Sequence, residues 1–399
     1  MTVFARYGEV LRGHGTAVPL VASTVGRLSL GMTTFALLLL VRDSSGSYAA
    51  AGLASGAYAL SFGLVGPVLA RLADRTGPVR VLRALAVVHP LLLLAVVLAS
   101  RAGAPLPVLL APVVLAGATV PPVGPVMRAL WASVLDSRSI ATAYSLESVV
   151  VELCFVLGPL LVTVLGLLGG ASAPVLASGL LAGAGAAWLS ATARVREVRP
   201  ASREPGSRSG PLSSPAVRAL LLTVLGVGAS FGAVEVAVPA FVEGQGGRAA
   251  SAGVLLAVWS SGSIVGGLLY GGLRLRAAPS QQLPVLVAAL ALGTAAPLAA
   301  DGPVSLGVAL FAFGLTIAPV MACNAVLLAA ATPTGTVTEA FAWNTSMIFG
   351  GAALASVLAG LLVERSGPTG ALVLVAACGA LALAAATAAW ERSRDAVRT

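Results

Sequence analysis

Five ionisable side chains lie inside long apolar runs of this sequence, and their types and positions make them the first candidates for chemistry. They are Arg27, Arg128, Glu147, Glu152 and Glu235. A charged side chain within a membrane-spanning segment is costly unless it is paired or hydrated, so such residues commonly carry protons or bind a ligand.

Two of these residues lie at a similar depth in their runs. Arg27 is ten residues into the run 17–41, and Glu152 is eleven residues into the run 141–168. In a helix these positions are about 15 Å deep. Both therefore approach the midplane of a bilayer core about 30 Å thick.

The other two acids have different surroundings. Glu147 precedes Glu152 by five residues, so the two side chains point about 140° apart on a helix. Glu147 is nearer the end of its run, where it is either hydrated or within reach of Arg128 or Arg138. Glu235 has no obvious basic partner in its half of the chain, and burial would favour its protonated form. That suits proton coupling, and exposure to a wide vestibule is the alternative.

Polar residues in later apolar runs are candidates for substrate contact. They are Asn324, Trp343 and Asn344. Hydrogen bonding between helices is the alternative role for the asparagines. The three cysteines have no paired spacing and there are two histidines, so we expect no metal site and no disulfide framework. We also expect no cofactor and no enzyme activity, because no catalytic constellation and no nucleotide-binding loop is present.

The composition predicts a membrane protein with many spans. Of 399 residues, 58% are hydrophobic and 10% are charged, whereas a soluble domain has about 25% charged residues. Mean hydropathy is +0.97. The net charge of +9 comes with 24 arginines and no lysine, and we attribute it to membrane orientation rather than to nucleic-acid binding.

The apolar runs predict twelve transmembrane helices in two groups of six. A polar segment rich in Arg, Ser, Pro and Gly, residues 194–215, separates residues 1–193 from residues 216–399 and is predicted to be a cytoplasmic linker. The predicted spans are 17–41, 48–70, 81–100, 106–130, 141–168, 173–193, 216–241, 250–273, 283–299, 304–331, 340–363 and 370–390.

Arginine placement predicts the orientation. With the N-terminus inside, eighteen arginines fall in cytoplasmic segments, four fall outside, and Arg27 and Arg128 fall within spans. Positive residues gather on the cytoplasmic side. Both termini are therefore predicted to be cytoplasmic, in a bacterial cytoplasmic membrane.

The short loop after the second span carries a family resemblance. Leu72-Ala73-Asp74-Arg75-x-Gly77 resembles the loop between helices 2 and 3 of the major facilitator superfamily, whose pattern is Gly-x-Leu-Ala-Asp-Arg-x-Gly-Arg-Lys. Ala70 replaces the first Gly, and Pro78 and Val79 replace the two basic residues. Gly77-Pro78 also predicts a tight turn.

Weak similarity between the halves extends the resemblance over the whole chain. At an offset of 201 residues, Tyr58 aligns with Trp259 and Gly66 with Gly267. Such repeats are typical of major facilitator transporters. The resemblance implies two six-helix bundles around a central cavity, with spans one and five adjacent. We therefore expect Arg27 and Glu152 to form a pair or to face the substrate, and Asp74, Arg75, Gly77 and Arg128 to act in gating.

The resemblance implies a secondary active transporter that works by alternating access. Gly158-Pro159 resembles part of a motif of drug/proton antiporters in this superfamily, although the flanking glycines of that motif are absent. We predict a monomer, surrounded by lipid, that exports a small amphipathic or sugar-like molecule in exchange for protons. Proton-coupled uptake is one alternative, and a sensor or scaffold without transport activity is another.

Overall fold

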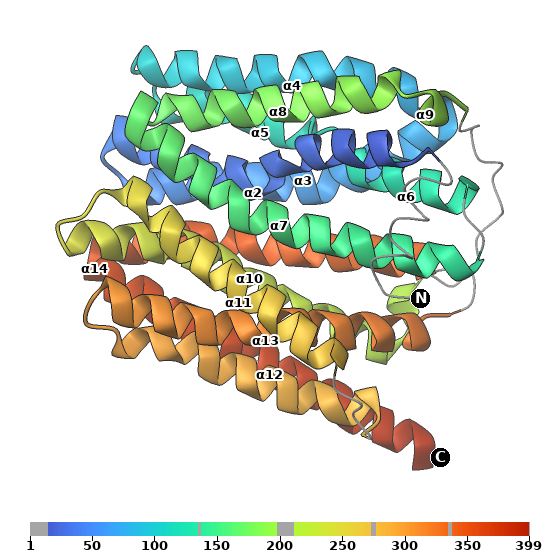
Figure 1. Ribbon diagram of the computed structural model, residues 1–399. Helices are drawn as coiled ribbons and strands as arrows, with labels where there is room; N and C mark the ends of the chain where they lie inside the picture. The colour runs from blue at the N-terminus through green and yellow to red at the C-terminus, as the bar shows by residue number, and fades with distance from the viewer. Residues whose placement is uncertain (1–14, 135–136, 198–210, 273–276, 334–336, 399) are drawn as a thin grey trace. The chain divides into compact units, whose positions relative to one another are not determined.

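A computed structural model shows long helices joined by short connections (Figure 1). The structure describes residues 15–134, 137–197, 211–272, 277–333 and 337–398, and these ranges contain helices but no strand. The all-helical prediction is therefore confirmed. The helices are α2 (Ala17–Ser45), α3 (Tyr48–Thr76), α4 (Pro78–Arg101), α5 (Leu106–Ala118), α6 (Val123–Val134), α7 (Ser137–Gly169), α8 (Ser172–Ala191), α9 (Ala193–Glu197), η1 (Pro211–Ser213), α10 (Pro215–Gly244), η2 (Ala249–Ser251), α11 (Ala252–Gly272), α12 (Pro279–Ala295), η3 (Ala296–Ala299), α13 (Pro303–Ala331) and α14 (Val337–Arg398).

Eleven helical stretches of the described chain are long and apolar enough to cross a membrane. The last stretch, Ala340–Ala388, has 49 residues, which as one straight helix would measure about 74 Å. It is divided at Gly367, whose φ of 69° and ψ of −170° are not helical, and Pro368 follows. Counted on both sides of Gly367, the described residues hold the twelve predicted spans.

The fourth span differs from the prediction, because it is broken in the middle. We expected one helix over residues 106–130, but α5 ends at Ala118 and α6 begins at Val123. Pro121 and Pro122 have no backbone N–H, so a helix that continued here would lack two of its hydrogen bonds. Four residues of non-helical backbone therefore separate α5 from α6.

The chain divides into two compact units. The first unit contains residues 1–40 and 64–203, and the second contains residues 41–63 and 204–399. In the first unit, α4 packs against α5 and α8, and α7 packs against α8. In the second unit, α10 packs against α14, α11 against α13, and α12 against both α13 and α14. The predicted linker falls largely on residues 198–210, which lie outside the described residues.

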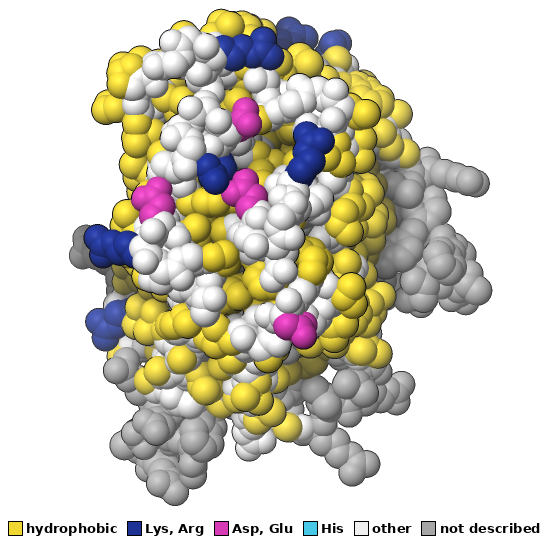
Figure 2. All heavy atoms as spheres, turned by 90° about the vertical axis from the view of Figure 1, so that its left-hand side faces the viewer, with side chains coloured by type: hydrophobic (Ala, Val, Ile, Leu, Met, Phe, Trp, Pro, Cys, Tyr) yellow, Lys and Arg dark blue, Asp and Glu magenta, His cyan; other side chains and the backbone are white. Residues whose placement is uncertain are grey.

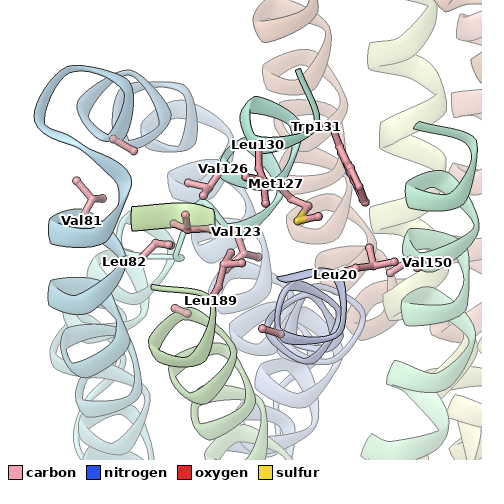
Figure 3. Close-up of a cluster of buried hydrophobic side chains, with 14 of the residues drawn as sticks. Leu20, Val81, Leu82, Val123, Val126, Met127, Leu130, Trp131, Val150 and Leu189 are labelled. Carbon is pink, nitrogen blue, oxygen red and sulfur yellow. The ribbon is translucent and has the colours of Figure 1, made fainter. Parts of the chain in front are cut away.

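A buried apolar cluster holds one end of the first unit together (Figure 3). Leu82 of α4, Leu189 of α8, and Met127, Leu130 and Trp131 of α6 are fully buried within it. Full burial of a side chain of this size contributes about 1.5–3 kcal/mol. This packing fixes α6 against α4 and α8.

Helices α2 and α7 approach each other closely at two glycines of the first unit. A Cβ atom on Gly158 would lie 2.5 Å from the carbonyl carbon of Gly31, and one on Gly31 would lie 2.2 Å from the carbonyl oxygen of Cys154. Carbon atoms in contact are normally about 3.5–4.0 Å apart. Since α7 continues through Pro159 to Gly169, Gly158 serves helix packing rather than ending the helix.

The first turn of α3, in the second unit, is capped by a residue of α14. The N–H of Ala49 donates a hydrogen bond to Oε1 of Glu364 at 3.1 Å, and the hydroxyl of Ser47 donates to the same oxygen. The Ser47 oxygen in turn accepts from the N–H of Ala50 at 3.0 Å. These bonds satisfy N–H groups that have no partner within the helix.

Large apolar side chains are exposed along many helices, as expected for contact with lipid. Leu168, Val304 and Leu292 are examples, with exposed fractions of 83%, 82% and 75%. On the face seen in Figure 2, arginine and acidic side chains lie among hydrophobic ones. Soluble monomers rarely expose large contiguous apolar patches.

Candidate functional site

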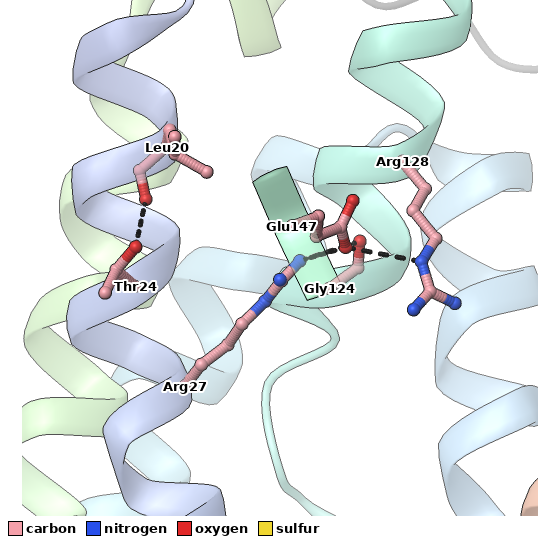
Figure 4. Close-up of polar contacts among 6 residues, drawn as sticks. All are labelled: Leu20, Thr24, Arg27, Gly124, Arg128 and Glu147. Carbon is pink, nitrogen blue, oxygen red and sulfur yellow. Dashed lines mark hydrogen bonds and ion pairs between the residues drawn. The ribbon is translucent and has the colours of Figure 1, made fainter. Parts of the chain in front are cut away.

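Three of the predicted ionisable residues meet in the first unit, where two arginines contact the same carboxylate oxygen of a glutamate (Figure 4). Nη2 of Arg27, from α2, lies 2.5 Å from Oε1 of Glu147, from α7. Nε of Arg128, from α6, lies 3.2 Å from the same oxygen. Nη2 of Arg27 also donates to the carbonyl oxygen of Gly124 at 3.5 Å. We call this group the Arg27–Glu147–Arg128 cluster.

Burial within the cluster is uneven. The side chains of Arg27 and Glu147 are 2% and 3% exposed, whereas that of Arg128 is 65% exposed. Among the described residues, Nη1 of Arg27 and Oε2 of Glu147 have no hydrogen-bond partner. The cluster therefore contains two positive charges, one negative charge and two buried polar atoms that are not satisfied.

The acid that pairs with Arg27 is Glu147 and not Glu152. That Arg27 and Glu152 both face the substrate, the second half of the expectation, stays a prediction. The reason for the observed pairing is the rotation of α7, which is set by the contact of Gly158 with α2. Counting 100° per residue, Glu147 lies about 20° from the direction of Gly158, and Glu152 lies about 120° from it. Glu147 thus faces α2, while Glu152 is half-buried and makes polar interactions of its own. The alternative that Glu147 reaches Arg128 is confirmed, whereas the Arg138 side chain is outside the described part.

In the second unit, the predicted polar residues form a link between helices. Nδ2 of Asn324, on α13, donates to Oδ1 of Asn344, on α14, at 3.3 Å. Asn324 is 1% exposed and the neighbouring Trp343 is 36% exposed. Glu235 lies on α10, half-buried and engaged in polar interactions. This geometry agrees with the alternative of helix–helix hydrogen bonding for the two asparagines.

Comparison with known proteins decides the family. The family model of the Major Facilitator Superfamily matches residues 20–323. The chain is a member of the major facilitator superfamily. Among curated proteins, none matches it in sequence.

Solved major facilitator structures share the fold at low sequence identity. A bacterial homologue of the human lysosomal transporter Spinster, inward-facing and unoccupied, has a TM-score of 0.72 and 16% identity over 96% of this chain and 98% of that chain. The nucleoside transporter NupG has a TM-score of 0.69 and 13% identity over 94% and 98% of the two chains. The POT family transporter PepTSo has a TM-score of 0.67 and 13% identity over 94% of this chain and 97% of that chain.

Membership of the major facilitator superfamily establishes the general class of the protein. It is an integral membrane transporter rather than an enzyme. Members of this superfamily move small molecules across membranes.

The loop motif of the superfamily lies where the sequence predicts it. Arg75 is exposed in the last turn of α3, and Asp74 lies in the same turn with its side chain outside the described part. Gly77 has a φ of 91° and Pro78 begins α4. A φ in this range favours glycine, which explains the Gly-Pro turn. A role of this loop in gating stays a prediction.

The break between α5 and α6 is the feature that sequence reasoning missed. Gly124, in the first turn of α6, contacts Arg27, and a Cβ at this position would lie 3.4 Å from its Nη2 atom. Two consecutive prolines within a predicted span were the available signal. In transporters, helices interrupted at mid-membrane depth commonly border the binding site.

Proposed function

We propose that this protein is a proton-coupled secondary transporter and that Glu147 carries the proton. The observation that supports this is the Arg27–Glu147–Arg128 cluster, in which one buried carboxylate holds two guanidinium groups from two other helices. A non-transporting sensor or scaffold, the remaining alternative, has no evident use for such a buried charge, which is costly in a membrane.

Protonation of Glu147 would change what holds the three helices together. The ionised carboxylate attracts Arg27 of α2 and Arg128 of α6 to α7. A neutral carboxyl group loses this attraction, so both arginines become available to other partners. Because Arg128 is largely exposed, its side of the cluster is the side from which a proton would enter.

We also propose the substrate class and the transport direction that the sequence favours. They are export of a small amphipathic or sugar-like molecule by a monomer in a bacterial cytoplasmic membrane, with both termini inside. Glu152 and Glu235 are proposed as further proton-linked acids, and Asn324, Trp343 and Asn344 as residues close to the substrate. Asp74, Arg75, Gly77 and Arg128 are proposed as gating residues.

Proton-coupled uptake is a second candidate, and the geometry of Glu147 favours it. In an exchanger, the substrate and the proton compete for the same group. Glu147 is 3% exposed and already contacts two arginines, so it is poorly placed to receive a substrate directly. A proton that frees the arginines would instead help a substrate to bind, and the two would then travel together.

The test is proton movement driven by a substrate gradient. Purified protein is placed in liposomes that contain a pH-sensitive dye, and a panel of drugs, sugars, amino acids and organic acids is added outside. We expect at least one compound to change the internal pH, and we expect Glu147→Gln to abolish that change. The sign of the change separates exchange from cotransport.

A matched control is available at Asp301, between η3 and α13. Its Oδ1 accepts a hydrogen bond from Ser305 at 2.6 Å, which lowers the pKa of this exposed carboxyl group. Asp301→Asn should therefore leave the proton signal unchanged. Compound flux without any pH change, in the parent and in Glu147→Gln alike, would refute proton coupling at Glu147.

A further inference from the structure

We infer that Arg27 and Arg128 form a binding site for a carboxylate group, and that the transported molecule is a small organic anion. This inference rests on the proposed function, because it assigns the substrate class to the same cluster. It departs from the prediction of a sugar-like molecule and refines the prediction of an amphipathic one.

The charges of the cluster are not balanced by the residues that the structure describes. Two guanidinium groups approach one carboxylate oxygen, and Nη1 of Arg27 is buried without a partner. A guanidinium group binds a carboxylate best through two parallel N–H···O bonds. A second carboxylate would supply the missing negative charge and a partner for Nη1.

The broken span contributes to the same site. The first turn of α6 lies against Arg27, since Gly124 accepts a hydrogen bond from its Nη2 atom. Because position 124 is a glycine, no side chain fills the space beside the guanidinium group, where a Cβ would lie 3.4 Å from Nη2.

The two arginines of the site differ in how accessible they are. Arg128 is 65% exposed and is met first, whereas Arg27 is 2% exposed and lies behind Glu147. An incoming carboxylate therefore contacts Arg128 and then competes with Glu147 for Arg27. Cys154 is a further titratable group on α7, the helix that carries Glu147, and its thiol contacts the carbonyl oxygen of Thr24 at 3.9 Å.

Competition between two carboxylates links anion binding to protonation. A proton on Glu147 removes the competitor and strengthens binding of the anion. By thermodynamic reciprocity, the bound anion then strengthens proton binding to the same extent. The anion and the proton therefore bind together, as a cotransporter requires, and this favours the uptake alternative over export in exchange for protons.

Equilibrium binding of benzoate tests the inference without any transport. The protein is placed in phosphatidylcholine nanodiscs at pH 8, and binding is measured by calorimetry, with neutral benzamide as the matched control ligand. Glu147→Gln should bind benzoate roughly 10–100-fold more tightly than the parent, because charge-assisted hydrogen bonds are gained. Arg128→Gln should weaken binding by a similar factor, and neither change should affect benzamide.

Two further measurements keep the inference testable if Glu147→Gln does not fold. In the parent protein at about pH 8, benzoate should bind more tightly than benzamide, which has nearly the same shape and no charge. Nanodiscs that contain anionic phosphatidylglycerol should give the same affinity. Loss of benzoate binding there would mean that a lipid headgroup occupies the arginines, and would overturn the assignment to a substrate.

The inference is overturned if Glu147→Gln and the parent bind benzoate equally, or if benzamide binds as tightly as benzoate. Failure of the proposed function looks different. Tight, Arg128-dependent benzoate binding without proton movement in liposomes would leave the anion site standing and remove proton coupling. Proton movement that is driven by a neutral or cationic compound and is lost in Glu147→Gln would leave proton coupling standing and would remove the anion site.

Discussion

The contact between α2 and α7 should respond strongly to a single added side chain at Gly158. A Cβ there would lie 2.5 Å from both the carbonyl carbon and the carbonyl oxygen of Gly31, about 1 Å or more inside normal contact distance. Overpacking of this kind costs about 1–3 kcal/mol. In Gly158→Val, this corresponds to a roughly 5–150-fold larger population of states in which the two helices are separated.

A buried cysteine beside the contact reports the separation. Cys154 lies one turn before Gly158 and is 1% exposed. When opening is fast, the rate of reaction with a thiol reagent follows the population of the open state. We therefore expect Cys154 in Gly158→Val to react with a maleimide roughly 5–150-fold faster than in the parent, as followed by peptide mass spectrometry.

Two internal controls make the result specific. Cys323 and Cys378, in the second unit, are 1% and 5% exposed and should react at unchanged rates. Gly350→Val is the matched variant, because a Cβ on Gly350 meets no atom within 4 Å. Equal Cys154 reactivity in Gly158→Val and the parent would refute the close-packing argument, as would equal acceleration at all three cysteines.

Three further predictions concern other parts of the chain. Gly77→Ala places a side chain at a φ of 91° and should cost about 1–3 kcal/mol, seen as a lower midpoint in thermal unfolding. An unchanged midpoint would contradict the turn geometry. Asn324→Leu removes the 3.3 Å bond to Asn344 and should cost about 0.6–2 kcal/mol, and a more stable variant would contradict this. Glu243→Gln breaks the 3.0 Å ion pair with Arg42, whose partners are 31% and 28% exposed. It should cost at most about 1 kcal/mol at low salt and nothing measurable at about 1 M salt, so a salt-independent loss would contradict the prediction.

Much of the fold was predictable because a bilayer places a simple demand on the sequence. Every span needs about 20 apolar residues, and turns such as Gly77-Pro78 and Gly367-Pro368 mark where spans end. The interruption in the fourth span was not predicted, because the apolar run continues on both sides of Pro121 and Pro122. Only the missing N–H groups of the two prolines, not their polarity, reveal the break.

The site was predictable in its members but not in its pairing. The free-energy cost of a charged side chain inside a membrane span identified Arg27, Arg128 and Glu147 as unusual. Depth along the span suggested Glu152 as the partner of Arg27, whereas rotation of α7 selects Glu147. That rotation depends on where Gly158 meets Gly31, a contact between residues 127 positions apart, and a single sequence contains no direct record of it.

The cap on α3 has a consequence for how the chain is made. The N–H of Ala49 receives its partner from Glu364, 315 residues later in the chain. At a synthesis rate of about 5–20 residues per second, roughly 15–60 s pass before that carboxylate leaves the ribosome. During this interval Ser47 is the cap that α3 has from its own sequence. The first turn of α3 is therefore completed only after residue 364 has been made, so a chain truncated before Glu364 would keep the cap of Ser47 on Ala50 and lose the partner of the Ala49 N–H.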